Sequence, residues 1–352
     1  MNRKSVAVIG GGIAGMETAT YLASLGFKTT LIEKSGQLGG KIRNWYKLFP
    51  NFSHSIEVFN HLQRGIDLSD VVVKLNTEVV AVEKMNPGFV LQLNNSEKLN
   101  ADSIVICTGY DLFDARLKEE YGYGIYDNVI TSAELEKMFA SDKGIITKSG
   151  QPPKKIGFVH CVGSRDEKVG NTYCSKVCCV TGVKQAIEVK EMIPGCEVFN
   201  FYMDLRMFGM HFEAMYKKAQ EEHGVNFVRG RLSECAETID GAINLKVEDT
   251  LLGRPMKLSV DMLVLMVGMV PSEGTKKIGS LLGLEFGKNG FFKSRDQHSM
   301  ANISNIPGVF MAGACINPIT ISHVFGHAHS AALMVASYLN NLPIENRVTE
   351  VV

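Results

Sequence analysis

The chain has 352 residues, with 37 basic and 37 acidic side chains and 45% hydrophobic residues. This balance of charge excludes the strong positive field that binds nucleic acid or an anionic membrane surface. The longest apolar run, residues 262–270, is too short for a membrane span, which needs about 18 residues. At roughly 150 residues per domain, this length and a content of 34 glycines predict a two-domain α/β enzyme.

The N-terminus leads directly into an apolar run at residues 5–9, so we expect no cleavable signal and a cytoplasmic location. Eight cysteines in such a reducing compartment predict thiols or metal ligands in place of structural disulfides. Half of them fall within residues 161–179, which concentrates the expected metal chemistry in one segment.

A glycine-rich turn lies between a predicted strand at residues 5–9 and a helical pattern over residues 16–25. Its spacing is G-x-G-x-x-G, as in dinucleotide-binding turns. In this pattern Gly10 permits the tight turn, Gly12 lets a pyrophosphate approach, and Gly15 lets the helix pack closely on the strand. The turn therefore predicts a dinucleotide-binding site.

Two further features complete this prediction. Ile13 and Ala14 stand at the positive N-terminal end of the helix, where the pyrophosphate is expected to bind. A second predicted strand, residues 29–32, ends in Glu33, whose carboxylate is suited to accept hydrogen bonds from the adenosine ribose.

The loop after this acid contains Lys34, Gly39, Gly40 and Lys41. We expect all four to lie at the cofactor, because the paired glycines let the backbone pass close to a nucleotide. The ammonium group of Lys41 is suited to neutralise phosphate charge.

Two later segments are expected to contribute to the same site. Val79 lies in a predicted strand over residues 78–83, and a buried strand over residues 101–107 ends at Thr108 and Gly109. This Thr-Gly pair resembles the one that closes the first nucleotide-binding segment of two-dinucleotide flavoproteins.

A second α/β unit follows, and then the chain returns to the first. The predicted strands and helices of this unit are residues 155–159, 177–192, 197–203, 212–222, 225–228 and 256–267. The return comprises a strand that ends in Gly313 and Ala314 and a helix over residues 322–339. Ile321, Ser322 and His323 stand at the start of this helix, where its N-terminus is expected to face the cofactor.

This order resembles that of two-dinucleotide flavoproteins, a class of α/β proteins. The resemblance implies a discontinuous Rossmann-like FAD domain, residues 1–125 and 270–352, interrupted by a second nucleotide-binding-like domain, residues 126–269. It also implies that the first site binds FAD and not NAD.

In the second domain, cysteines stand where a second glycine turn is expected. After the strand at residues 155–159 come Cys161, Cys174, Cys178 and Cys179, with the spacing C-x12-C-x3-C-C. A site of four cysteines suits structural zinc, but adjacent cysteines fit poorly on one tetrahedral ion. Adjacent cysteines can bind different irons of a cubane, so we expect these four residues to hold a [4Fe-4S] cluster.

The stretches Cys-Val-Gly-Ser-Arg-Asp, Tyr-Cys-Ser-Lys-Val-Cys-Cys and Tyr-Met-Asp-Leu-Arg-Met-Phe-Gly begin at residues 161, 173 and 202. They resemble the flavin subunit of heterodisulfide reductase and of related quinone-interacting oxidoreductases. The resemblance covers nearly the whole chain. It implies an electron-transferring FAD and [4Fe-4S] subunit in sulfur or disulfide metabolism, a homodimer, and further subunits of a heterodisulfide-reductase-like complex.

The chain departs from these families at two points. It lacks the C-x2-C-x2-C-x3-C segments of full-length relatives, and so resembles the short versions found in sulfur-oxidising complexes. Gly313 is followed by Ala314 and Cys315 instead of an acidic residue, so backbone groups are expected to contact the ribityl chain.

Two other functions stay open: a stand-alone NAD(P)H-dependent flavin oxidoreductase, which the missing second glycine turn disfavours, and a scaffold with structural zinc. Cys107 is expected to be a core residue, whereas Cys315 lies beside the expected flavin. Asp204 and Arg206 are expected to form an ion pair, with partner docking an open alternative.

Overall fold

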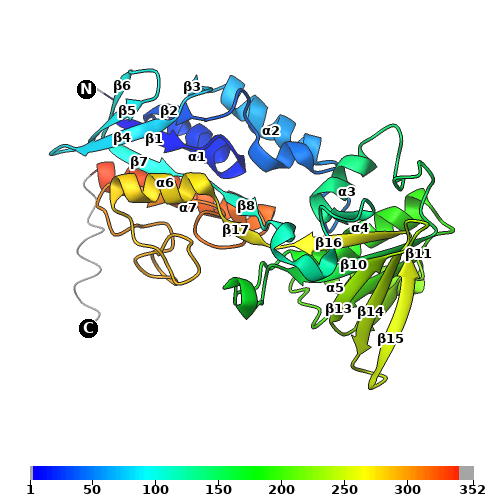
Figure 1. The fold of residues 1–352 in the computed structure, drawn as a ribbon. Helices are drawn as coiled ribbons and strands as arrows, with labels where there is room; N and C mark the ends of the chain where they lie inside the picture. Colours follow the sequence, from blue (N-terminus) through cyan, green and yellow to red (C-terminus); the bar gives the residue numbers. More distant parts are fainter. Residues whose placement is uncertain (1–2, 341–352) are drawn as a thin grey trace. The chain divides into compact units, whose positions relative to one another are not determined.

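The computed structural model describes residues 3–340, which form two compact units (Figure 1). The first comprises the chain up to Arg43, Ile56–Asp111 and the chain from Val270; the second comprises Asn44–Ser55 and Leu112–Met269. The domain limits expected from the sequence, 125/126 and 269/270, stay a prediction. No helix in the described part of the chain is long and apolar enough to cross a membrane.

A five-stranded parallel sheet forms the centre of the first unit. Its strand order is β18-β7-β1-β2-β3, in which the central strand is the apolar segment next to the N-terminus. In register, Val8 lies opposite Leu31 on one side and Val105 on the other, and all three side chains are buried. The strands are β1 (Ser5–Ile9), β2 (Lys28–Ile32), β3 (Val72–Lys74), β7 (Ser103–Ile106) and β18 (Val309–Met311).

Helices and a small antiparallel sheet complete this unit. Helices α1 and α7 pack against each other, and their apolar residues join the core of the parallel sheet. The helices are α1 (Ile13–Ser24), α2 (Ser55–Asp67), α6 (Glu273–Leu282), α7 (Ile321–Leu339) and the 3-10 helix η1 (Gly40–Asn44). The antiparallel strands are β4 (Val79–Lys84), β5 (Phe89–Leu93) and β6 (Lys98–Ala101).

The single strand expected over residues 101–107 is wrong. The structure has a break at Asp102, with β6 before it and β7 after it. The reason is that the Asp102 carboxylate accepts hydrogen bonds from Ser5 N at 2.7 Å and Ser5 Oγ at 2.9 Å. The side chain therefore ties the turn to the first strand of the parallel sheet.

The second unit contains another five-stranded parallel sheet, with the order β12-β11-β10-β16-β9. The central strand β10 and its neighbour β16 are buried along nearly their whole length. The strands are β9 (Val129–Thr131), β10 (Lys155–Val162), β11 (Glu197–Tyr202), β12 (Asn226–Arg229) and β16 (Met262–Val267). Helices α3 (Ser132–Phe139), α4 (Cys178–Met192) and α5 (Phe212–Glu221) supply the rest of the core.

A three-stranded antiparallel sheet, β13-β14-β15, belongs to this unit. Its strands are β13 (Leu232–Glu237), β14 (Ile243–Asp249) and β15 (Arg254–Val260), and β14 alternates strictly between buried and exposed residues. The predicted region 256–267 is thus divided between two sheets. Asp261 marks the division, because its carboxylate accepts hydrogen bonds from Lys154 N and Lys155 N.

A buried charge network lies beneath the start of the second unit's core. Lys184 Nζ lies 2.6 Å from Glu136 Oε1 and 3.2 Å from Glu188 Oε2, and all three side chains are at most 2% exposed. The other Glu136 oxygen accepts a hydrogen bond from Tyr46 N, and Lys184 also donates to Lys47 O. This network holds the segment 44–55 against α3 and α4.

Candidate functional site

In the first unit, several predicted site residues lie at one edge of the parallel sheet. Strands β1, β7 and β18 run in the same direction, so the residues that follow them, Gly10, Thr108 and Gly313, lie at the carboxyl edge. In parallel α/β sheets, ligands bind at this edge. The structure thus brings together three segments that are far apart in the sequence.

The glycine turn leaves room for a ligand at one position and none at two others. Gly10 has φ +111°, and a Cβ there would lie 2.4 Å from Cys107 O. A Cβ on Gly15 would lie 1.7 Å from Gly10 O. Around Gly12, by contrast, no described atom lies within 4 Å of an added Cβ. The backbone at Gly12 is therefore open, as a bound pyrophosphate requires.

The start of α1 is free to bind an anion. Gly12 is the N-cap residue, and no described side chain caps it. Ile13 and Ala14 follow as the first helical residues, so their N–H groups belong to the turn that has no partner within the helix. A phosphate group at this end of the helix would accept these hydrogen bonds and meet the positive end of the helix dipole.

The Glu33 carboxylate is buried and firmly oriented. One oxygen accepts a hydrogen bond from Gly11 N at 2.6 Å, and the other accepts bonds from Ser35 N and Ser35 Oγ, both at 2.7 Å. A carboxylate has about four acceptor positions, so lone pairs remain for ribose hydroxyls. Sequence reasoning missed Ser35, although a serine two residues after an acid is a common local partner.

The loop after Glu33 passes close to the glycine turn. Gly39 N donates to Gly11 O at 2.8 Å, and a Cβ on Gly40 would lie 3.1 Å from Gly12 Cα. Lys34, in contrast, is exposed to solvent. The paired glycines therefore have the predicted close approach.

Lys41 is engaged by a side chain that the sequence analysis missed. Its ammonium group lies 3.1 Å from Asp111 Oδ1 and 5.3 Å from the centre of the Tyr110 ring. The other Asp111 oxygen accepts a hydrogen bond from Glu273 N. Lys41 thus has a carboxylate partner in this structure, which reduces the positive charge it offers to a phosphate.

Thr108 and Gly109 are fixed to α6. Thr108 Oγ1 lies 2.7 Å from Thr275 Oγ1, and Ser272 Oγ, which caps α6, donates to Thr108 O. Val79 begins β4, and its side chain is buried in the hydrophobic core. Only the backbone of Val79 is therefore available to a cofactor.

The start of α7 adjoins the start of α1. A Cβ on Gly313 would lie 2.7 Å from Ala14 Cβ, so these two predicted residues are in direct contact. The first residues of α7 are Ile321, Ser322 and His323, and the last two are exposed. Thr320 Oγ1, at the N-cap, bonds to His323 Nδ1 at 2.6 Å and not to the helix backbone.

In the second unit, Cys161 lies on a strand and not in the expected loop. Strand β10 continues to Val162, beyond the predicted end at Val159. Its register with β16 shifts between these two residues, and Cys161 has φ +61°. A bulge of this kind redirects a side chain, and here it occurs at the first cysteine of the motif.

The segment between Cys161 and Cys178 forms an ordered hairpin-like loop. Arg165 N donates to Tyr173 O, and Asp166 and Asn171 bond to each other through their backbones. Ser175 Oγ accepts a hydrogen bond from Met269 N at 2.9 Å, next to the end of β16. These bonds return Cys174 to the same sheet edge as Cys161.

Cys178 and Cys179 are the first two residues of α4, and both are buried. Cys179 Sγ donates to Asp204 O at 3.6 Å, and Cys174 Sγ accepts from Lys176 N at 3.3 Å. Burial raises the pKa of Cys161 to about 12, and the neighbouring Cys179 and Cys174 raise it further. The pKa of Cys178 rises for the same reason, with contributions from the other three thiols. The four thiols thus lie close enough to influence one another.

Within residues 3–340, no three or more His, Cys, Asp or Glu side chains are arranged around a single metal ion. This result gives no support to the zinc alternative, in which all ligands meet on one atom. Residues with positive φ concentrate here: Cys161, Arg165 and Lys176. Such backbone strain is typical of functional loops.

Asp204 forms the expected ion pair with Arg206, at 4.0 Å, but its main partner is Arg165, at 2.6 Å. Hydrogen bonding to Arg165 lowers the pKa of Asp204. Sequence reasoning missed Arg165, which lies between the first two cysteines of the motif and was the available signal.

The isolated cysteines are buried thiols. Cys107 is part of the hydrophobic core, as predicted. Cys315 is fully buried, and its thiol donates to Ala312 O at 3.2 Å. Burial raises the pKa of Cys315 to about 12, which disfavours the redox role considered for it.

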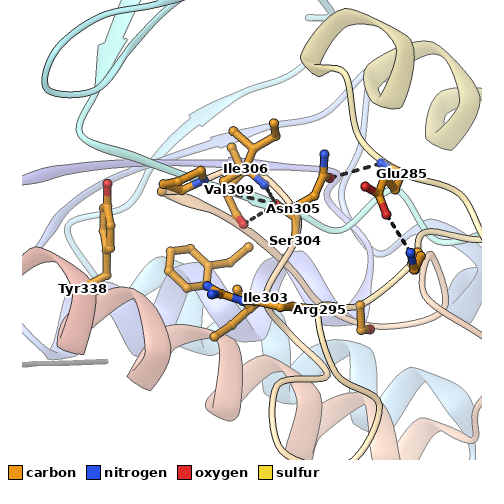
Figure 2. Close-up of a pocket in the computed structure, with 13 residues that line it drawn as sticks. Glu285, Arg295, Ile303, Ser304, Asn305, Ile306, Val309 and Tyr338 are labelled. Atoms are coloured by element: carbon orange, nitrogen blue, oxygen red, sulfur yellow. Dashed lines mark hydrogen bonds and ion pairs between the residues drawn. The ribbon is translucent and has the colours of Figure 1, made fainter. Parts of the chain in front are cut away.

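A cavity of about 510 Å³ lies at a different place in the first unit (Figure 2). Ile303, Val309, Phe310 and Tyr338 are among its lining residues. Because β18 begins at Val309, the cavity is at the amino end of the parallel strands, opposite the glycine turn. We therefore assign no part of the dinucleotide site to it.

The two parallel sheets, each with a candidate site at its carboxyl edge, define an α/β fold of the pyridine nucleotide-disulphide oxidoreductase type. The family model described as pyridine nucleotide-disulphide oxidoreductase matches residues 4–334. The chain belongs to this family, which confirms the expected fold class and the expected class of enzyme, an oxidoreductase. Membership also supports FAD as the dinucleotide of the first unit.

Solved structures agree with this fold. The thioredoxin reductase of T. acidophilum is 17% identical with a TM-score of 0.67, and the alignment covers 97% of this chain and 100% of that chain. The thioredoxin reductase of Lactococcus lactis is 19% identical, also with a TM-score of 0.67 and with the same coverage. At these identities the likeness concerns the fold alone.

Curated relatives confirm the expected resemblance to this subunit of heterodisulfide reductase. The matching subunit of the H(2):CoB-CoM heterodisulfide,ferredoxin reductase of Methanothermobacter thermautotrophicus is 32% identical over 414 positions, which cover 94% of this chain and 63% of the relative. The iron-sulfur subunit of the CoB–CoM heterodisulfide reductase of Methanocaldococcus jannaschii is 32% identical over 421 positions, covering 95% and 64%. The chain therefore spans less than two thirds of these relatives. The alignments are longer than the chain's 352 residues, so the relatives have extra residues within the aligned region.

Proposed function

We propose that the chain is the electron-transferring FAD and [4Fe-4S] subunit of a heterodisulfide-reductase-like complex. The observation that carries this proposal is the replacement of a second glycine turn by four cysteines at the carboxyl edge of the second parallel sheet. In this proposal Cys161, Cys174, Cys178 and Cys179 hold one cluster.

The residues of the first unit fit FAD. The open backbone at Gly12 and the uncapped start of α1 suit a pyrophosphate, and the oriented Glu33 carboxylate suits a ribose. The exposed start of α7 would place a positive helix end at negative charge on the flavin. When bound, FAD would supply two-electron chemistry that can also proceed in single electrons.

The residues of the second unit fit a cubane cluster. A [4Fe-4S] cluster binds one cysteine at each of four irons, so its ligands do not have to meet on one atom. The start of α4 would stabilise the negative charge of Cys178 and Cys179 as thiolates. Arg165 Nη1 is buried and has no hydrogen-bond partner among the described residues, so it is available to a sulfur atom at this site.

The same geometry disfavours the stand-alone NAD(P)H-dependent reductase. The strand β10 leads into the cysteine loop, residues 163–177, where a nicotinamide dinucleotide would need a short glycine turn and an open helix start. In the second unit the first helical residues are Cys178 and Cys179, whose buried side chains occupy this position.

The proposed partners come from the relatives. Both are named as one subunit of a reductase that acts on the CoB–CoM heterodisulfide, and one of them is named as an iron-sulfur protein. By this similarity we propose a homodimer that joins further subunits and passes electrons toward a disulfide or another small sulfur compound. A cytoplasmic location stays a prediction.

The test is an anaerobic visible spectrum with flavin and iron quantified per chain. We expect one flavin and about four irons. Cys174→Ser should lose iron and retain flavin, whereas the control Cys235→Ser, which changes an isolated thiol of β13, should retain both. Zinc without iron, or bleaching of the flavin by NADH at catalytic rates, would overturn the proposal.

A further inference from the structure

Four arginines surround one aspartate at the cysteine-bearing edge of the second unit. Arg165 Nη2 lies 2.6 Å from Asp204 Oδ2, Arg206 lies 4.0 Å from the same oxygen, and Arg229 lies 3.9 Å from Oδ1. Arg231 completes the group, because its Nε lies 3.0 Å from Met203 Sδ and its Nη2 donates to Arg165 O. We call these four arginines and Asp204 the arginine patch.

The patch has an excess of positive charge. Asp204 is its one carboxylate among the described residues, and the nearby Asp166 is paired with Lys118 at 2.6 Å. Arg229 is half exposed and Arg231 is exposed, so their charges face solvent. Since the whole chain has zero net charge, this local excess is a feature of one surface and not of the composition.

An apolar tip adjoins the patch. Phe208 and Met210, two and four residues after Arg206, are 78% and 81% exposed. They are the outermost residues of the segment that joins β11 to α5, and Met207 anchors this segment in the core. Gly209 and His211 have φ values of +142° and +74°, so the chain makes a tight excursion here. Exposed large apolar side chains beside charged ones are typical of protein-binding surfaces.

This surface lies directly over the proposed cluster site. Cys179 Sγ donates to the Asp204 carbonyl oxygen at 3.6 Å, and the backbone of Arg206 also contacts this thiol. The arginine patch and the apolar tip are therefore separated from a proposed cluster ligand by one layer of backbone. Short distances of this kind are what an electron carrier needs from its docking site.

We propose that the arginine patch and the apolar tip form the docking surface for an acidic protein that carries single electrons. The arginines would steer and orient a partner of opposite charge, and Phe208 and Met210 would fill the desolvated centre of the interface. This inference rests on the proposed function, because only a cluster beneath the surface gives an electron carrier a reason to bind here.

The experiment measures binding of two probes to the complete chain by titration calorimetry. Flavodoxin is the acidic probe, and cytochrome c is the basic probe of comparable size. We expect flavodoxin to bind, and binding to weaken as the Debye length is reduced from about 30 Å at 0.01 M to about 3 Å at 1 M ionic strength. We expect no binding of cytochrome c.

Two variants and two controls locate the binding site. Phe208→Ser combined with Met210→Ser should weaken flavodoxin binding at least about tenfold, because it removes the apolar centre. Arg229→Gln should weaken binding chiefly at low ionic strength. Leu251→Ser and Arg116→Gln, which change exposed residues elsewhere in the same unit, should leave the affinity unchanged.

Three results would overturn the inference: no binding of flavodoxin, equal binding of cytochrome c, or equal losses in the variants and their controls. A fourth is a change from dimer to monomer in the Phe208 and Met210 variant, measured by light scattering, because the tip would then join two copies of this chain. Iron is quantified in every sample. A chain without iron contradicts the proposed function, whereas an iron-containing chain that fails to bind contradicts only the docking surface.

Discussion

The two parallel sheets solve the same geometric problem with different chemical groups. In the first unit, the short segment 10–12 joins β1 to α1, and the site consists of backbone left open by glycine. In the second, the longer segment 163–177 joins β10 to α4, and the site consists of cysteine side chains. The edge of a parallel sheet can therefore present either N–H groups for phosphate or thiols for iron, depending on one connection.

The difference extends to the start of each helix. At α1, the N-cap glycine and the absence of a capping side chain leave the first N–H groups to a ligand. At α4, Cys178 and Cys179 are themselves the first helical residues and are buried. One helix dipole thus awaits an external anion, and the other acts on side chains of its own chain.

The largest expected effect comes from closing the backbone site. Gly15→Ala would place a Cβ 1.7 Å from the Gly10 carbonyl oxygen, which cannot move without distorting β1. We expect a loss of at least about 4 kcal/mol of unfolding free energy and of bound flavin. Urea unfolding and the flavin-to-protein ratio measure both.

Gly326→Ala is the control for this substitution. Gly326 lies inside α7, no described atom lies within 4 Å of an added Cβ, and its φ is not positive. Alanine should be neutral or should stabilise the helix by up to about 1 kcal/mol. Similar losses for both substitutions would show that the turn is not sterically restricted.

The second unit should depend instead on side-chain charge. Lys184→Met removes the cation that lies 2.6 Å from Glu136 and 3.2 Å from Glu188, and so leaves buried acidic groups without compensation. We expect a loss of about 3–5 kcal/mol in urea unfolding. Lys217→Met, which breaks the exposed pair with Glu221, should cost less than about 1 kcal/mol. Equal costs would remove this contrast.

A pH dependence isolates one member of the network. Burial raises the pKa of Glu188 from 4.5 to about 7, and Glu136 adds to the rise, while Lys184 opposes it. The folded chain therefore keeps a proton that the unfolded chain loses between these values. Stability from this group is present at low pH and is lost as the pH rises to about 7, by about 3 kcal/mol.

Glu188→Gln should remove this dependence. The measurement is the difference in unfolding free energy between the variant and the natural chain across the same pH range, which cancels other groups. Among these is His160, where burial lowers the pKa to about 4 and gives the opposite slope. A difference that does not change with pH would mean that Glu188 is ionised throughout.

The smallest effect is expected at Lys41. Its ion pair with Asp111 is partly exposed, so Lys41→Met should change the unfolding free energy by less than about 1 kcal/mol. Flavin affinity should change little, because Asp111 already neutralises the ammonium group. A tenfold weaker flavin affinity, about 1.4 kcal/mol, would instead show that Lys41 acts on a phosphate.

The sequence predicted the features that depend on local pattern. The glycine turn, Glu33 and the cysteine spacing follow from residues that are near one another in the chain, and the apolar runs predict most strands. The bulge at Cys161 was not predictable, because it arises from the pairing of β10 with β16. The same applies to Asp111, which reaches Lys41 from a distant segment.

The pairing of Arg165 with Asp204 and the burial of Lys184 have the same origin. Charged residues in a sequence are expected at the surface, and only tertiary contacts show that Lys184 is 2% exposed. The sequence also contains no signal that residues 44–55 pack with the second unit, because Tyr46, Phe49 and Phe52 follow no helical or strand period.

The path of residues 44–55 has a consequence for how this architecture can be divided or recombined. The second unit is not a continuous cassette, because Tyr46 N satisfies Glu136 and Phe49 stacks edge-on against Phe212. A fragment of residues 112–269 would expose an apolar surface and a buried acid at once. Any exchange of the cysteine-bearing unit between relatives would therefore have to transfer this short segment as well, although it is encoded far upstream.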